Sequence, residues 1–210
     1  MQYSKTIYII DSDSSARESL VYWLSELGYQ ARAFSDSKRF LSYFHSSMTG
    51  CLLVDWRLPD MSGLELQSVL EQHRCALSVI FLSECADIQV AVKAIKQGAQ
   101  DFFIKPFCNE ALLAAIHHAM KQSQSRYYQY QEHASMEACL SALTKRELEI
   151  MQLIVEGKYN KVISIDLGIG EKTVEIHRSR IMRKMKVRTL AELVKKVVCY
   201  QQFFKVESVC

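Results

Sequence analysis

The sequence contains no apolar stretch that approaches the roughly 20 residues required for a membrane-spanning helix. Its first segment, MQYSKTIYIIDSDSS, also lacks the long apolar core and small-residue cleavage site of a secretory signal peptide. We therefore expect a cytoplasmic protein that has no membrane partner.

Cysteine and histidine patterns typical of disulfide or metal sites are missing as well. The 7 cysteines form no C-x-x-C pair, and the 6 histidines show no recognisable metal-binding spacing. An odd number of cysteines in a reducing compartment disfavours disulfides, so we expect free thiols. Cys51 and Cys199 lie in apolar patterns, where thiols pack as small hydrophobic groups.

What is present is the composition of a folded protein, with 49% hydrophobic and 23% charged residues in a chain of 210. This length suits one domain of ordinary size and a smaller partner. The pattern predicts a first domain at residues 1–122, a partly helical linker at 123–141 and a second domain at 142–210.

The first domain alternates short apolar runs with amphipathic helical patterns. The runs TIYII, QARAF, CLLV, SVIFL and QDFFI read as five strands, and helical spacing of apolar residues separates them. Such alternation predicts an α/β fold in which helices cover both faces of a parallel sheet.

The second domain shows no strand runs and carries the positive charge of the chain. Four helical patterns are predicted after residue 143, so this domain should be entirely helical. Residues 1–125 hold 11 basic and 13 acidic side chains, whereas residues 126–210 hold 15 and 10. Because phosphate backbones require positive charge, double-stranded DNA is the expected partner of this half.

Polar side chains follow the predicted strands of the first domain where each strand ends. Asp55 follows CLLV, Asp11 and Asp13 follow IYII, Ser83 follows SVIFL, and Lys105 follows DFFI. The carboxyl ends of parallel strands meet at one edge of a sheet. A carboxylate nucleophile, acidic groups for Mg²⁺, a hydroxyl and an ammonium together predict a phosphoacceptor site.

A helix-turn-helix pattern lies in the second domain, with its turn at residues 167–170. In the second helix, Val174, Ile181 and Met185 fall on a narrow arc that should pack against the core. The opposite face is basic and suits the major groove of DNA, although charged residues can also merely solvate a helix. The candidate DNA-binding residues are Lys172, Thr173, Glu175, Ile176, Ser179, Arg180, Arg183 and Lys184.

Glu175 has two readings in this basic helix. Its carboxylate can accept a hydrogen bond from a cytosine amino group, or it can pair with a neighbouring cation. His177 and Arg178 lie on or beside the packing arc, and we expect them to be structural.

Two long motifs now support a family resemblance. The chain resembles a response regulator of the NarL/LuxR class, and within it the FixJ subgroup, through LTKRELEIMQLIVEGKYNKVISIDLGIGEKTVEIHRSRIMRKMKVRTLAELV and through LPDMSGLEL and DFFIKPF. The resemblance implies a flavodoxin-like receiver domain with a five-stranded parallel sheet, followed by an all-α helix-turn-helix domain. It also implies a transcription factor rather than an enzyme, which dimerises, binds specific DNA and contacts the transcription machinery after a partner histidine kinase phosphorylates it.

The resemblance assigns roles to individual residues. Asp55 would be phosphorylated, Lys105 would face the phosphoryl group, Ser83 would be the switch hydroxyl, and Phe102 the rotating aromatic residue. Mg²⁺ would be held by Asp11, Asp55 and the backbone carbonyl of Arg57.

One position departs from the family pattern. Receivers usually carry two consecutive acidic residues after the first strand, but here Ser12 follows Asp11. A hydroxyl binds Mg²⁺ more weakly than a carboxylate, so metal affinity should fall unless Asp13 compensates, directly or through water. The expected metal site thus includes either Asp13 or Ser12 as a further ligand. The alternative is therefore an atypical receiver that regulates DNA binding without phosphorylation.

A phosphatase of the haloacid dehalogenase type is the enzymatic alternative. IYIIDSDSS provides an Asp-x-Asp pattern with Asp11 as nucleophile and Asp13 as acid, and Ser83 and Lys105 match that family's other roles. The late acidic pair of such enzymes is missing, because the next Asp after Lys105 is Asp166, in the helical domain.

Overall fold

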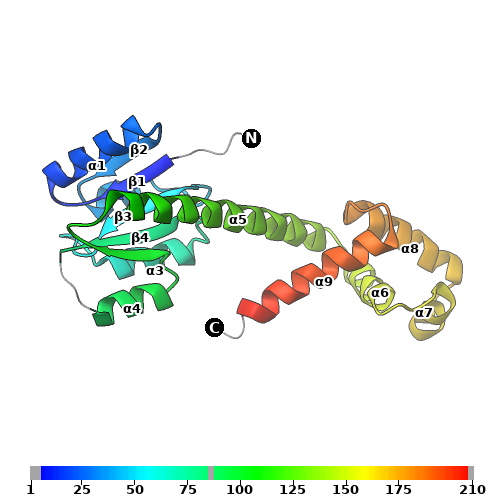
Figure 1. Cartoon of the computed structure of the whole chain (residues 1–210). Helices are drawn as coiled ribbons and strands as arrows, with labels where there is room; N and C mark the ends of the chain where they lie inside the picture. Colours follow the sequence, from blue (N-terminus) through cyan, green and yellow to red (C-terminus); the bar gives the residue numbers. More distant parts are fainter. Residues whose placement is uncertain (1–5, 85–87, 208–210) are drawn as a thin grey trace. The chain divides into compact units, whose positions relative to one another are not determined.

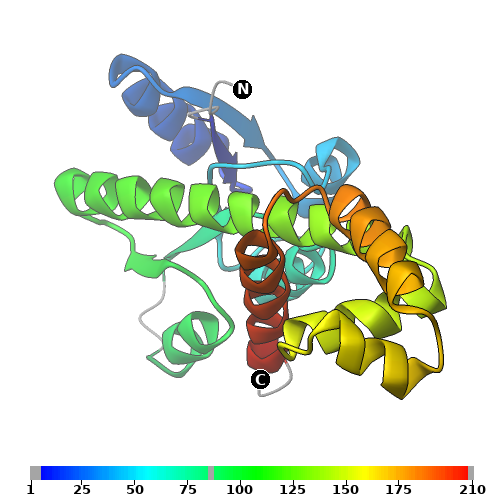
Figure 2. The same cartoon turned by 90° about the vertical axis from the view of Figure 1, so that its right-hand side faces the viewer.

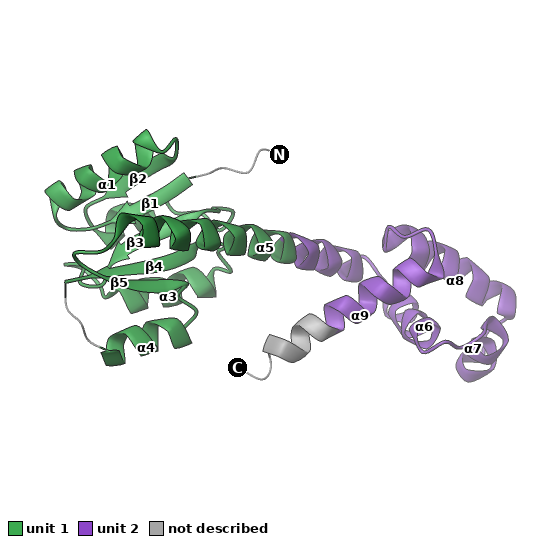
Figure 3. Ribbon diagram, viewed as in Figure 1, with its two compact units in different colours: residues 1–130 green, residues 131–210 purple. Residues whose placement is uncertain are grey.

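The computed structural model describes residues 6–84 and 88–207. The chain divides into two compact units, Met1–Tyr130 and Gln131–Cys210 (Figure 3). The boundary falls inside one long helix, α5. The elements of the first unit, up to and including α5, are β1 (Thr6–Ile10), α1 (Ser14–Glu26), β2 (Gln30–Phe34), α2 (Ser37–Tyr43), β3 (Cys51–Asp55), α3 (Gly63–Gln72), β4 (Ser78–Ser83), α4 (Ile88–Lys96), β5 (Asp101–Ile104) and α5 (Asn109–Ser141).

The five strands form one parallel sheet in the order β2-β1-β3-β4-β5 (Figure 1). The predicted α/β fold is thus confirmed, including the second strand, QARAF. β1, β3 and β4 are buried on both faces, which explains their nearly continuous apolar sequences. The edge strand β2 is largely exposed, which explains its weaker apolar signal.

Helices cover both faces of the sheet (Figures 1 and 2). Alternate side chains of the central strands enter two separate cores, one on each face. On one face, Ile9 and Leu53 pack with Leu24 of α1 and Ile116 of α5. On the other face, strand residues such as Val54 pack with side chains of α2, α3 and α4. The period of two along each strand produces this division.

Polar caps determine where several helices begin. Asp13 accepts a hydrogen bond from the Ser15 N–H and caps α1. In the loop after β3, the Asp60 carboxylate accepts hydrogen bonds from the N–H groups of Ser37 and Lys38 in the first turn of α2. Such caps satisfy backbone donors that have no partner within the helix.

The second unit contains the end of α5 and four further helices around one core. Val174 and Ile181 pack there with Ile150 and Ile163, and Gly168, with φ of +61°, ends the helix before the turn. The predicted helix-turn-helix arrangement is confirmed. The helices are α6 (Lys145–Val155), α7 (Asn160–Leu167), α8 (Glu171–Lys184) and α9 (Leu190–Glu207).

The segment expected to be a partly helical linker, residues 123–141, is helical throughout and belongs to α5. The Ser123 hydroxyl is buried in the first unit, where it accepts a hydrogen bond from the Gly50 N–H at 2.8 Å. Within residues 6–84 and 88–207, the cysteines are free thiols. In the same ranges, no helix combines the length and apolar character needed to cross a membrane.

Candidate phosphoacceptor site and DNA-binding helix

Three strand ends bring Asp11, Asp55 and Lys105 together at the carboxyl edge of the sheet. The Lys105 Nζ donates to Asp11 Oδ2 at 2.7 Å and to Asp55 Oδ2 at 2.8 Å. Both acidic residues are buried: Asp11 is 1% exposed and Asp55 is 9% exposed. Burial by itself would lower the pKa of Lys105, but the hydrogen bonds to Asp11 and Asp55 outweigh it and raise that pKa above its usual value.

The loop after β3 folds back toward the Asp55 carboxylate. Asp55 Oδ1 accepts a hydrogen bond from the Arg57 N–H at 2.8 Å, so both of its oxygens are oriented. The Gly63 N–H donates to the Trp56 carbonyl at 3.2 Å, which closes the loop onto the start of α3. At the rim, the Arg57 guanidinium lies 3.7 Å from the exposed Glu84 carboxylate.

Ser83 and Phe102 occupy the strands that border this site. Ser83 is the last residue of β4 and is buried, and its carbonyl accepts a hydrogen bond from the Lys105 N–H at 2.7 Å. Phe102 lies on β5, half-buried, with its ring centroid 6.3 Å from that of Phe81. Their switch roles stay predictions.

The site offers two carboxylates, those of Asp11 and Asp55, as ligands for Mg²⁺. Asp11 Oδ1 accepts from the Asp13 N–H at 2.9 Å, whereas the Asp13 carboxylate caps α1 and the Ser12 side chain is exposed. No cluster of three His, Cys, Asp or Glu side chains able to hold a metal ion occurs in the described residues. Mg²⁺ is commonly bound by one or two carboxylates with waters, so Asp11 and Asp55 fit such an ion.

Arg17, which sequence reasoning missed, borders the same edge. Its Nη1 donates to the backbone carbonyls of Asp11 at 2.6 Å and Ser12 at 2.9 Å. This contact fixes the turn that presents Asp11 and adds a positive charge close to the Asp11 carboxylate. The sequence did offer a signal for this contact, because Arg17 lies in the first turns of the helix that follows Asp11.

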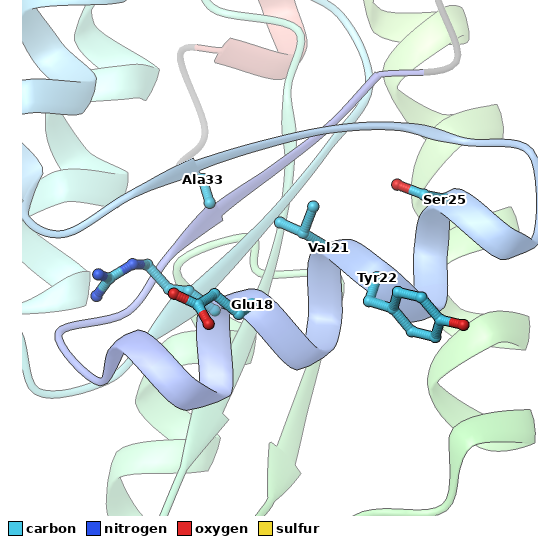
Figure 4. A pocket seen from close by; sticks show the side chains of 6 residues that line it. Glu18, Val21, Tyr22, Ser25 and Ala33 are labelled. Carbon is cyan, nitrogen blue, oxygen red and sulfur yellow. The ribbon is translucent and has the colours of Figure 1, made fainter.

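Arg17 also lines a hollow of about 390 Å³ between α1 and β2 (Figure 4). Its lining is mainly apolar and includes the exposed ring of Tyr22. The remaining lining residues are Glu18, Val21, Ser25 and Ala33.

In the second unit, α8 has the two faces that its sequence predicts. Val174 and Ile181 are buried, as is Met185, which follows the helix. On the other side, most of the candidate DNA-binding residues are exposed: Lys172, Thr173, Glu175, Ile176, Ser179, Arg180 and Arg183.

Lys184 differs from the other candidates. Its Nζ lies 2.6 Å from Glu147 Oε2, and its side chain is only 27% exposed. Glu147 also accepts from the Thr144 N–H, and the ion pair with Lys184, followed by this hydrogen bond, lowers the pKa of Glu147 from 4.5 to about 2. In the structure Lys184 therefore joins α8 to α6, and a DNA contact by Lys184 stays a prediction that would require this pair to open.

Known protein families match both units. Residues 7–117 match the response regulator receiver domain, and residues 141–197 match the luxR family of bacterial regulatory proteins. The chain belongs to the NarL/LuxR class of response regulators. In this response regulator, as in its family, a receiver precedes a DNA-binding domain that regulates transcription.

Individual relatives agree over nearly the full chain. The response regulator protein TodT of Pseudomonas putida is 38% identical over 91% of this chain and 85% of its own. The transcriptional regulatory protein FixJ of Azorhizobium caulinodans is 34% identical over 93% of this chain and 92% of its own. The solved structure of the response regulator StyR matches with a TM-score of 0.81 and 38% identity, over 93% of this chain and 98% of that one. These matches favour the response-regulator reading over the phosphatase.

Replacing Glu147 with Gln in this response regulator should destabilise the DNA-binding domain by about 2 kcal/mol, because Lys184 loses its carboxylate partner but can partly reach solvent. Since folding lowers the pKa of Glu147 from 4.5 to about 2, its stabilisation is complete above pH 4.5 and is lost as the pH falls toward 2. Urea denaturation of the full chain, with hydrogen exchange of α6 and α8, measures both effects.

The matched control is Glu149→Gln, which removes an exposed carboxylate paired with Arg146 on the same helix. An exposed pair contributes below about 1 kcal/mol, so this variant should remain close to the wild type. Equal losses in the two variants, or an unchanged acid dependence in Glu147→Gln, would contradict the assignment.

Proposed function

We propose that a partner histidine kinase transfers a phosphoryl group to Asp55, and that this modification promotes dimerisation and sequence-specific DNA binding. The observation that carries the proposal is the bridge from Lys105 to Asp11 and Asp55 at the carboxyl edge of the sheet. It combines a nucleophile, a second carboxylate and a cation within hydrogen-bonding distance.

Asp55, Arg57 and Lys105 each have a separate role in the phosphoryl transfer. An Asp55 oxygen attacks the phosphorus of the phosphohistidine in line, and the P–N bond to the imidazole breaks as the new P–O bond forms. The Arg57 N–H and Lys105 orient the carboxylate, and Lys105 then offsets charge on the phosphoryl oxygens. When bound, Mg²⁺ would be held by Asp11, Asp55 and the Arg57 carbonyl, with Asp13 or Ser12 beside it, and would supply further charge neutralisation.

The phosphoryl group adds negative charge and hydrogen-bond acceptors beside β4. The Ser83 hydroxyl would move to meet a phosphoryl oxygen, and the Phe102 ring would turn inward into the vacated space. Because Phe102 is on β5, this movement would repack the surface formed by α4 and β5.

That surface carries exposed apolar side chains. Ile88, Val92 and Ile95 lie at helical spacing along α4 and are all exposed, Ile88 at 78%. Ile104, on the neighbouring strand β5, is exposed as well. Contiguous exposed apolar side chains favour a protein interface, so we assign homodimerisation to this α4–β5 surface.

A symmetric dimer would present two α8 helices to two half-sites of a duplex. Arg180 and Arg183 would bind phosphates, while side chains in the first half of α8 would meet base edges. The bound dimer would then recruit or block the transcription machinery in the cytoplasm.

The test is to measure molecular mass in solution and duplex affinity with and without a small-molecule phosphodonor and Mg²⁺. The proposal expects a phosphodonor-dependent rise in dimer content and in affinity, and an affinity that falls with ionic strength. Identical self-association and identical DNA binding in both samples would refute phosphorylation control.

Ser12 supports a second candidate, a receiver that regulates DNA binding without phosphorylation. The position that would carry a second metal-binding carboxylate holds an exposed hydroxyl, and the Arg17 guanidinium lies against its backbone carbonyl. Both features weaken attraction for a divalent cation.

Introducing Ser12→Asp should therefore tighten Mg²⁺ binding about tenfold, because it adds a carboxylate next to Asp11. Titration with MgCl₂ followed by the fluorescence of Trp56, which adjoins Asp55, measures the change. Ser14→Asp adds the same charge in the first turn of α1 and is the control. Equal tightening in both variants would indicate general electrostatics, and a wild type that already binds as tightly as Ser12→Asp would remove the reason for the second candidate.

A further inference from the structure

We propose that α8 reads two kinds of base edge in the major groove, with Glu175 accepting a hydrogen bond from a cytosine amino group and Ile176 packing on a thymine methyl group. This inference rests on the proposed DNA binding by α8 and specifies the base pairs that its half-site contains. Both side chains lie in the first half of the helix and are exposed.

Among the residues that the structure describes, none forms a hydrogen bond or ion pair with the Glu175 carboxylate. Lys172, three residues earlier, and Arg178, three residues later, are at spacings where a helical ion pair can form. Over residues 6–84 and 88–207, however, the structure contains no ion pair that involves Glu175. The structure therefore does not support the hypothesis that Glu175 pairs with a neighbouring cation of the helix.

A carboxylate brought toward DNA is repelled by the phosphates unless it meets a hydrogen-bond donor. The major groove offers such donors at the amino groups of cytosine and adenine. The adenine amino group stands beside the N7 acceptor of the same base, which repels a second acceptor, whereas the cytosine ring adds no acceptor next to its amino group. An ionised Glu175 therefore selects cytosine.

Ile176 is an apolar side chain on this exposed face and does not enter the core. It is 48% exposed and stands among polar and charged side chains, with Lys172 four residues before it and Ser179 three residues after it. A single exposed isoleucine is common on protein surfaces. On a face that enters the major groove, however, its apolar counterpart is the thymine methyl group.

Different side chains of α8 position the helix on the DNA and contact the bases. Arg180 and Arg183 carry fixed positive charge further along the same exposed face and suit phosphates, whose contacts set the register of the helix without reading sequence. Glu175 and Ile176 are consecutive and project about 100° apart around the helix. They therefore contact different base edges within one half-site.

Selection from a randomised duplex library, using the full chain treated with a phosphodonor, tests the Glu175 assignment. The wild type should enrich a cytosine at one position of each half-site. Glu175→Gln should change that base to adenine, because a glutamine amide can donate to N7 and accept from the amino group of adenine. Glu171→Gln removes an equal charge from the first turn of α8 and should keep the cytosine.

Substitution of deoxyuridine for thymidine in the selected duplex tests Ile176, because it removes only the methyl group. Wild-type affinity should fall about two- to fourfold at one thymidine of the half-site, as expected for the loss of one buried methyl contact. Ile176→Ala should lose this sensitivity. Ile165→Ala, at an exposed isoleucine of α7, should retain it.

The outcomes separate base reading from DNA binding itself. If the wild type binds duplexes but Glu175→Gln enriches the same bases, or if Ile176→Ala remains sensitive to deoxyuridine, the assignment of these side chains is overturned while DNA binding stands. If no duplex binds at any salt concentration, the proposed function fails together with the inference.

Discussion

Asp55→Asn is expected to abolish formation of the acyl phosphate when the full chain is incubated with a phosphodonor and Mg²⁺. The amide has nearly the shape of the carboxylate but no anionic oxygen to attack phosphorus. The structure orients both oxygens of Asp55, one toward the Arg57 N–H and the other toward the Lys105 ammonium. Intact-protein mass measurement gives the fraction phosphorylated, and the phosphodonor-dependent rise in dimer content should disappear with it.

Asp60→Asn is the matched control for this experiment. Asp60 lies on the loop that follows Asp55 and includes Arg57, but its two carboxylate oxygens accept hydrogen bonds from the Ser37 and Lys38 N–H groups in the first turn of α2. The amide oxygen of Asn can keep one of these two bonds, and the change lies away from the Asp55 carboxylate. This variant should be labelled like the wild type. Undiminished labelling of Asp55→Asn would remove Asp55 from its role, and labelling that depended on Asp11 alone would favour the phosphatase chemistry.

Val92→Asp is expected to keep the phosphorylated protein monomeric at concentrations where the wild type dimerises. Val92 lies in the middle of the exposed apolar stripe of α4, between Ile88 and Ile95. In a symmetric interface each substitution appears twice, so two carboxylates would lose water and face apolar surface. We expect the dimer dissociation constant to rise at least about tenfold, equivalent to roughly 1.4 kcal/mol.

Analytical ultracentrifugation after phosphodonor treatment measures this change, and labelling of Asp55 in the same sample shows whether the receiver still reacts. Tyr22→Asp provides the control, because Tyr22 is also an exposed apolar side chain but lies on α1. A phosphorylated Val92→Asp protein that dimerises as readily as the wild type would place the interface elsewhere.

Most of the fold could be predicted because its signals are local. The strands β1, β3 and β4 are continuous apolar runs, since both faces of the sheet are covered. The two faces of α8 follow from helical periodicity, and the buried Val174 and Ile181 confirm them. The continuous helix through residues 123–141 was only partly expected, because a polar segment gives little periodic signal.

The candidate sites could be predicted in outline for a related reason. Parallel strands end at one edge, so residues such as Asp55 and Lys105 had to lie near one another once the strands were recognised. Such reasoning could not predict three side-chain contacts. These are the hydrogen bond from Lys105 to Asp11, the capping of α1 by Asp13, and the contact of Arg17 with two backbone carbonyls. Each depends on a side-chain direction that strand order does not specify.

By itself, then, the sequence determined the order of strands and helices along the chain, the sheet edge that carries Asp55 and Lys105, and the exposed basic side of α8, because periodicity and strand ends are properties of neighbouring residues. Only the tertiary structure decided that Lys184 pairs with Glu147 while Glu175 stays without an ion pair in the described part of the chain. Lysine and glutamate side chains are long enough to reach several partners, and the packing of one helix against another selects among them.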